Sequence, residues 1–134
     1  GYRIVSWDFA KYVNHCCNFN TISTGYGFEI AVRDIKAGEQ ITDEYGIFNL
    51  TYDIELTCAE PNCRKTVKPK DFDTFYTQWD ETIKRSLTKF KSVDQPLLVF
   101  IDDFSKQELE AFIIDPLAYQ SVYSLRNQEG ISKL

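Results

Sequence analysis

Two short polar segments contain the side chains most able to bind a ligand. Asn14 and His15 are adjacent at the start of the run 14–20, and Tyr45 ends the polar run 38–45. An Asn amide offers a donor and an acceptor, and a neutral His ring offers one of each, so together they can bind a ligand that bears amino and carboxyl groups. Taken alone, an Asn-His pair is more often a satisfied turn, and a Tyr before a Gly is more often a core aromatic.

Four cysteines form a third group with metal-binding chemistry. Cys16 and Cys17 are adjacent, and Cys58 and Cys63 follow in the second quarter of the chain. In a reducing compartment, thiols at such positions are more often free or bound to a metal than paired in disulfides. The spacing of Cys58 and Cys63 alone would be unremarkable.

Composition predicts a globular domain with an acidic surface. The chain has 134 residues, of which 43% are hydrophobic and 15% aromatic, so it can bury a core. The net charge of −5 argues against a dedicated nucleic-acid binder and suits a basic partner. We see no apolar run of the ~18 residues that a membrane span needs and no signal-peptide pattern. The expectation is a soluble, intracellular protein without a membrane partner.

The elements that must position these side chains differ between residues 1–67 and 68–134. Apolar residues alternate with other residues over 26–33, which predicts a half-buried strand, and a second strand is expected at 40–45 after a turn at 36–39.

Beyond residue 68 the apolar period changes to 3.6. The apolar side chains of 72–90 fall on one face, with no Gly or Pro between them, which predicts one long helix or two abutting helices. Ser105 and Glu108 have the spacing of a capping box, and Asp115 before Pro116 predicts the start of another helical segment.

The two polar segments resemble the signature segments of the SET-domain protein-lysine methyltransferases. Residues 14–20 are similar to the family's Asn-His-Ser-Cys-x-Pro-Asn, with Phe19 at the place of the Pro, and 38–46 are similar to Gly-Glu-Glu-Ile-Thr-x-x-Tyr-Gly. The resemblance implies an α+β fold: a β-rich SET core, here its C-terminal half, in which a pseudoknot brings the two segments together. Residues 1–67 would form this half with a post-SET-like segment, and 68–134 a helical C-terminal extension like that of short bacterial members.

The resemblance also implies the chemistry. The function would be methyl transfer from S-adenosyl-L-methionine to a lysine of a basic protein such as a histone-like tail. Asn14 and His15 would contact the cofactor, and Tyr45 would be the catalytic residue that helps to align the amine with the methyl group in a narrow, desolvated channel.

Zinc is a further implication of the resemblance. Residues 58–64 look like the end of the post-SET segment, which implies Cys17, Cys58 and Cys63 as zinc ligands. Leu56 occupies the place of that segment's first cysteine, and structural zinc takes four ligands, so the fourth donor would be Cys16, Glu55 or Glu60. Cys16 is disfavoured because adjacent side chains of an extended chain point apart. A site that has lost its zinc and keeps free thiols is the alternative.

The resemblance covers residues 7–64, about the second half of a SET domain. The family's N-terminal strands have no counterpart before Asn14, and the Gly-x-Gly at 25–27 comes in the wrong order. We therefore expect either a part of a longer enzyme or a chain that self-associates, with apolar surface from Tyr26, Phe28 or Ile30 left open. The alternatives to an enzyme are a SET-like module that binds basic tails without methylating them and a small zinc-organised interaction domain.

Overall fold

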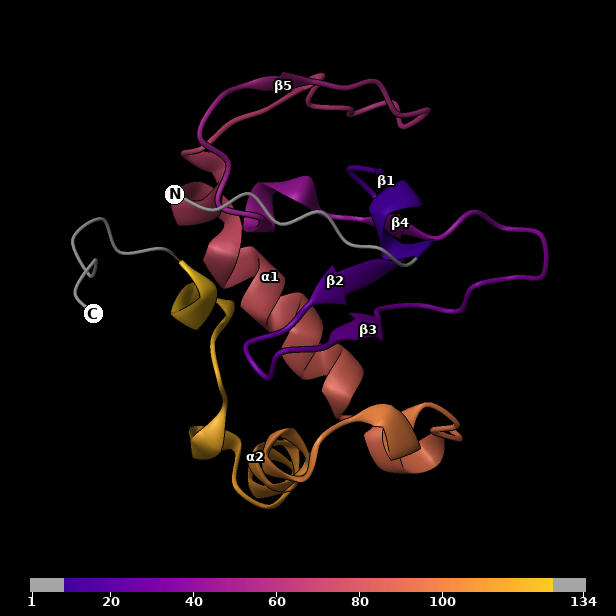
Figure 1. Ribbon diagram of the computed structural model, residues 1–134, viewed down its shortest axis with the longest axis vertical. Coiled ribbons are helices and arrows are strands. Elements are labelled where there is room, and N and C mark those ends of the chain that lie inside the picture. The colour runs from indigo at the N-terminus through magenta and orange to yellow at the C-terminus, as the bar shows by residue number, and fades with distance from the viewer. Residues whose placement is uncertain (1–8, 127–134) are drawn as a thin grey trace.

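Short strands pack against one long helix in the computed structural model, which describes residues 9–126 (Figure 1). Strand β1 (Asn14–His15) pairs in parallel with β4 (Thr42–Asp43), and β2 (Thr21–Ser23) pairs antiparallel with β3 (Glu29–Ala31). Thr42 O accepts the Thr21 hydroxyl at 3.0 Å, so the two pairs lie side by side.

A third strand pair carries two of the cysteines on its connection. Strand β5 (Ile54–Glu55) is antiparallel to β6 (Thr66–Val67), and the chain between them extends over β1 (Figure 1), where the Arg64 N–H donates to the Cys17 Sγ. The helices are α1 (Asp71–Leu87) and α2 (Asp103–Ile114). Single 3-10 turns occupy Phe9–Tyr12, Tyr45–Ile47, Phe90–Ser92, Leu98–Phe100, Pro116–Ala118 and Val122–Leu125.

The strand expected at 26–33 is shorter in the structure and lies in a hairpin. Tyr26 and Gly27 belong to its turn, where the Gly27 N–H donates to Thr24 O at 3.2 Å and the Gly27 φ of 83° suits a residue without a Cβ. Alternating burial nevertheless extends from 26 to 33. The apolar alternation therefore indicated which side faces the core, while the ladder itself is limited to three residues. The strand expected at 40–45 is likewise limited to Thr42–Asp43.

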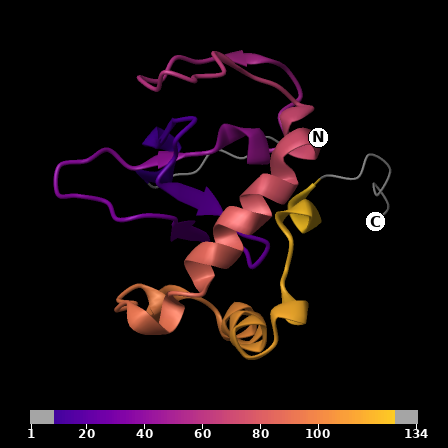
Figure 2. The ribbon, with the colours of Figure 1, turned by 180° about the vertical axis from the view of Figure 1, so that it is seen from behind.

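Helix α1 confirms the prediction from the 3.6-residue period. Acidic Asp71 and Asp73 lie in its first turn and basic Lys84 and Arg85 in its last, which complements the helix dipole at both ends. The helix ends at Leu87, before the 3-10 turn that contains the last apolar residue of the predicted face. Seen from behind, α1 crosses the molecule diagonally (Figure 2).

The predicted capping box at Ser105 is wrong. Helix α2 begins three residues earlier than that cap predicts, and the carboxylate of its N-cap, Asp102, accepts the Ser105 N–H at 2.9 Å. Asp and Ser are both good N-caps, and here Asp102 has the extended backbone that a cap needs, whereas Ser105 is buried inside the helix. The start expected at Asp115 and Pro116 is confirmed, with the Asp115 carboxylate accepting the Leu117 N–H.

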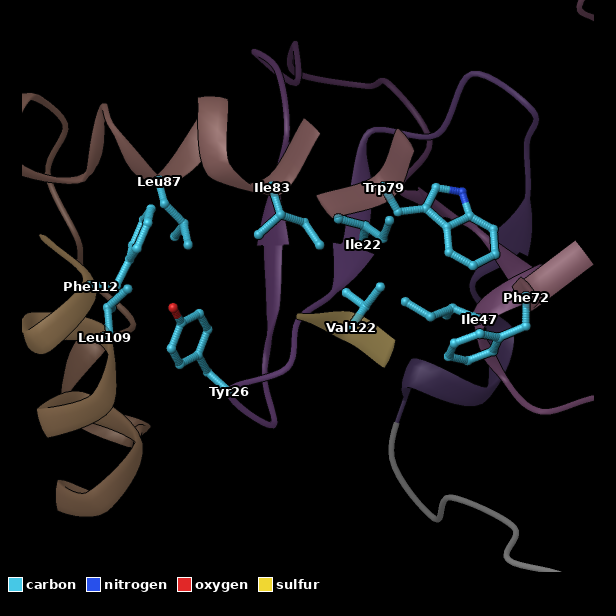
Figure 3. Packing of buried hydrophobic residues seen from close by; sticks show 10 residues of the cluster. All are labelled: Ile22, Tyr26, Ile47, Phe72, Trp79, Ile83, Leu87, Leu109, Phe112 and Val122. Atoms are coloured by element: carbon cyan, nitrogen blue, oxygen red, sulfur yellow. The ribbon is translucent and has the colours of Figure 1, made fainter. Parts of the chain in front are cut away.

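One hydrophobic core includes residues from both sides of position 68. Side chains from the β2–β3 hairpin, the turn after β4, α1, α2 and the C-terminal turns pack together (Figure 3): Ile22, Tyr26, Ile47, Phe72, Trp79, Ile83, Leu87, Leu109, Phe112 and Val122. Burial of this set supplies most of the driving force for folding. The domain boundary at 67/68 stays a prediction from sequence.

The apolar surface expected around Tyr26 is not open. Tyr26 is 2% exposed, its hydroxyl accepts the Gln120 N–H at 3.1 Å, and its ring contacts Tyr119 edge-on. Phe28 and Ile30 are half-buried against the same core. The C-terminal segment covers this face because the buried Asp80 carboxylate of α1 accepts bonds from three groups of residues 119–122.

Candidate functional site

The pairing of β1 with β4 brings the two polar segments together. Asn14 lies opposite Thr42 and His15 opposite Asp43. Asn20, which is 1% exposed, holds the second segment: its side-chain carbonyl accepts the Thr42 N–H at 2.8 Å, and its amide donates to Gln40 O at 2.8 Å. Sequence reasoning did not single out Asn20, although it ends the first motif.

Asn14 and His15 have different surroundings. The Asn14 side chain is exposed, whereas His15 is buried. The His15 Nδ1 atom lies 3.1 Å from Asp43 O and 3.2 Å from the Tyr45 N, and its Nε2 lies 3.5 Å from the Cys17 Sγ. Protein groups therefore surround the His15 ring, and Asn14 is the side chain of the pair that is directed to solvent. The cofactor contacts of both residues stay predictions.

The His15 ring is neutral at physiological pH. Burial lowers its pKa below the ordinary 6.5, and the nearby Arg64 guanidinium lowers it further, against the opposing effect of Glu44. A neutral ring carries one N–H, so Nδ1 either donates to Asp43 O or accepts from the Tyr45 N–H. In the second case Nε2 carries the proton and donates toward Cys17. The ring thus joins the β4 segment to the cysteine loop.

Tyr45 begins the 3-10 turn after β4 and is half-buried. Its hydroxyl donates to Val13 O, and its ring lies 5.5 Å from the His15 ring and 5.6 Å from that of Phe48. Burial, and then the charge of Asp43, raise the pKa of Tyr45 above its ordinary 10. The phenol therefore stays protonated at neutral pH and acts as a hydrogen-bonding group beside Asn14's strand. Its catalytic role stays a prediction.

Asp43 is a buried acid next to Tyr45. It is 2% exposed, and one carboxyl oxygen accepts the Glu44 N–H at 2.7 Å. Burial, and then the proximity of Glu29, raise the pKa of Asp43 to about 8. This shift favours the protonated form of the Asp43 carboxyl near neutral pH.

We expect this proton to make stability fall as pH rises. The folded pKa of Asp43 lies above the ordinary 3.8, so its contribution is complete below about pH 4 and is lost as pH rises through 8. The free energy of unfolding should decline over this window by at most about 1.4 kcal/mol per pH unit from this group. Asp43→Asn, which mimics the neutral acid, should flatten the decline in urea unfolding at pH 5 and 8. Parallel pH profiles of variant and wild type would contradict the assignment.

The three predicted metal ligands lie together. The Sγ atoms of Cys17, Cys58 and Cys63 are all within 4.8 Å of one another. Tetrahedral zinc with Zn–S bonds of about 2.3 Å holds its sulfurs roughly 3.8 Å apart, so a small contraction would suffice. Backbone N–H groups point at each sulfur, including those of Arg64 to Cys17 at 3.3 Å and Lys65 to Cys63 at 3.4 Å. Such donors stabilise thiolates, and the residues present fit a thiophilic metal.

Cys58 is the thiol best prepared to bind. Burial by itself raises its pKa, but N–H groups of Cys17 and Glu60 and the neighbouring Cys63 and Cys17 thiols outweigh this and lower the pKa of Cys58 to about 7. Cys16 and Cys17 differ from Cys58 in that their pKa values are raised, mainly by burial.

No fourth donor joins the cluster among residues 9–126. The group that lies within 4.8 Å contains the three cysteines alone in this part of the chain. Leu56, at the place of the family's first cysteine, instead donates its N–H to Lys65 O in the β5–β6 region. Glu60 accepts the Asn18 amide at 3.4 Å and Glu55 is exposed. Cys16, the third expected substitute, interacts with the Cys58 thiol but does not belong to the group of three sulfurs. The identity of a fourth ligand stays a prediction.

We expect purified protein to contain one zinc per chain. Cys63→Ser should abolish that stoichiometry because only two thiolates of the cluster then remain to hold the ion. Elemental analysis gives the metal content, and Cys16→Ser, whose thiol lies outside the cluster, should keep it. Far less than one zinc in the wild type, with four thiols free to react, would instead indicate a site that has lost its metal.

A comparison with known proteins supports a SET-domain relationship. The chain is similar to the Variant-silencing SET domain-containing protein of Plasmodium falciparum (isolate 3D7), with 36% identity over 61 residues that cover 40% of this chain. The chain spans 2% of the length of that protein. No protein-family profile matches the chain, and no solved structure matches it.

A membrane span is not found among the described helices. Neither α1 nor α2 is both long and apolar enough to cross a bilayer.

Proposed function

We propose that this chain takes part in S-adenosylmethionine-dependent methyl transfer to a lysine of a basic protein, as the C-terminal half of a SET domain with a helical extension. The parallel pairing of β1 with β4 is the observation that carries the proposal. It places the exposed Asn14 on the strand next to the segment that leads into Tyr45. The likeness to a SET domain-containing protein supports the same assignment.

The chain's own residues suit a reaction that depends on alignment. S-Adenosylmethionine, when bound, supplies an activated methyl group for in-line displacement by the lysine nitrogen. The Asn14 amide can donate to and accept from the cofactor's amino and carboxyl groups. Tyr45 keeps its proton, so its hydroxyl can orient the amine without acting as a base. The substrate lysine has an ordinary pKa of ~10.4, so its amine is charged in water. The partly buried surroundings of Tyr45 favour the neutral, nucleophilic form of that amine.

A basic substrate fits the charge of the chain. Asp and Glu exceed Lys and Arg by five, which attracts a Lys-rich segment and steers its encounter in a salt-dependent way. Histone-like tails have this chemistry. Peptide arrays should therefore show methylation of Lys-rich peptides well above that of acidic peptides with the same central lysine.

The decisive test is cofactor binding by Asn14 variants of the full-length protein. Asn14→Ala should weaken S-adenosylmethionine binding by ~1–3 kcal/mol because it leaves polar groups of the ligand unpaired. Isothermal titration calorimetry measures this, and Asn18→Ala, which changes another Asn of the same segment, is the control.

Two outcomes would contradict the proposal. Unchanged affinity of a folded Asn14→Ala protein would make Asn14 a turn residue. A full-length wild type that binds basic peptides and not S-adenosylmethionine would favour the non-catalytic binding module.

A further inference from the structure

Arg64 links three parts of the molecule through one side chain. Its Nη2 lies 2.6 and 2.8 Å from the two carboxylate oxygens of Glu44, and its Nη1 lies 3.4 Å from Asp71 at the start of α1. Its guanidinium stacks 5.1 Å from the centre of the Phe75 ring. The Glu44 side chain is 3% exposed, so loss of this partner would leave a buried carboxylate without its ion pair.

The backbone of Arg64 belongs to the cysteine loop. Its N–H donates to the Cys17 Sγ at 3.3 Å, and Arg64 directly follows Cys63. Any change in the positions of these sulfurs therefore moves the Cα from which the guanidinium extends. A metal that draws the three sulfurs together would restrict the position of the Arg64 Cα. The cysteines would then be held by metal–sulfur bonds in addition to the weak N–H···S contacts.

Glu44 transmits this position to the Tyr45 segment. The oxygen that accepts from Arg64 also accepts the Gly46 N–H at 2.8 Å, and it lies 3.8 Å from the His15 Nδ1. The Tyr45 N–H points at the same His15 nitrogen at 3.2 Å. The N–H groups of Tyr45 and Gly46 thus bind His15 and Glu44, and Arg64 contacts both of these side chains.

We propose that Arg64 is a positioning residue that couples metal binding at Cys17, Cys58 and Cys63 to the order of the Tyr45 segment. The coupling is reciprocal: whatever orders residues 44–46 also tightens metal binding. The coupling itself is a property of this chain. It rests on the proposed function only where the Tyr45 segment is given a role in methyl transfer.

Hydrogen exchange with and without zinc tests the coupling on the chain of 134 residues. In the wild type, zinc should slow exchange of the Tyr45 and Gly46 amides by about tenfold, a typical coupling between two sites. Arg64→Gln should still bind zinc, measured by competition with a chelator, and lose most of the slowing. Arg64→Lys, which restores the charge without the planar two-nitrogen contact, should recover part of it. Lys65→Gln removes the same charge from the next, exposed residue and should behave as the wild type.

Zinc-dependent protection that persists in Arg64→Gln would overturn the proposal, as would wild-type protein that binds no zinc or binds it without slowing these amides. If Arg64→Gln does not fold, Glu44→Gln decides the matter, since it keeps an acceptor for Gly46 but loses the ion pair and should also reduce the slowing. Failure of the proposed function has a different signature, in which these amides respond to zinc while the full-length protein binds no S-adenosylmethionine.

Discussion

Replacing Tyr45 by Phe should lower the rate of methyl transfer by about 100-fold or more while leaving S-adenosylmethionine affinity nearly unchanged. The substitution removes one hydroxyl that donates to Val13 O and keeps a ring that packs beside His15 and Phe48. The lost hydrogen bond should cost only ~1 kcal/mol of stability, so the loss of rate reports on alignment of the amine. Steady-state kinetics and calorimetry on the full-length protein measure the two quantities.

The control for this variant is Tyr52→Phe, because the Tyr52 side chain is 66% exposed and lies in the loop before β5. It should retain wild-type kinetics. A Tyr45→Phe enzyme that turned over at the wild-type rate would exclude a catalytic role for the Tyr45 hydroxyl.

Replacing Trp79 by Ala should cost about 3–5 kcal/mol of the free energy of unfolding. Trp79 is 3% exposed in α1, and its ring meets the Phe72 ring edge-on at 5.8 Å. It also lies so close to Gly46 that a Cβ there would come within 3.1 Å of the indole and of the Glu44 carboxylate. The loss is a large fraction of the 5–15 kcal/mol that holds a typical domain together.

This variant should also destabilise the 3-10 turn that contains Tyr45, because Gly46 of that turn packs against the indole. Urea unfolding gives the stability, and hydrogen exchange at Gly46 gives the local effect. Trp79→Phe should show an intermediate loss, and Phe104→Ala, on the exposed side of α2, should change stability by only about 0.5 kcal/mol or less. A Trp79→Ala protein as stable as Phe104→Ala would mean that the α1 contact does not support the turn.

Helix α1 packs against the turn that contains Tyr45. The core contains Ile47, two residues after Tyr45, together with Phe72 and Trp79 of α1. Removal of α1 would therefore expose the back of the turn that carries Tyr45. The C-terminal helices therefore contribute to the candidate site by packing.

Local sequence patterns predicted the elements that depend on neighbours a few residues apart. The 3.6-residue period of 72–90 predicted α1, and the Asp before Pro116 predicted the cap of the next turn, because helices and caps are made by groups within about four positions. The capping box at Ser105 failed within the same local range, since Asp102 offered a competing cap that accepts the Ser105 N–H. The motifs likewise selected Asn14, His15, Tyr45 and the three cysteines as the residues to examine.

Only the tertiary structure decided how those residues meet. The ion pair of Arg64 with Glu44 joins positions 20 residues apart, and the bond from the Arg64 N–H to Cys17 joins positions 47 apart. Burial of the His15 ring, the raised pKa of Asp43 and the contacts that cover Tyr26 likewise depend on packed neighbours from distant segments. Desolvation and long-range pairing are properties of the assembled interior, so the sequence determined which chemistry the chain carries, and the fold decided which of its groups are paired, charged or open to a ligand.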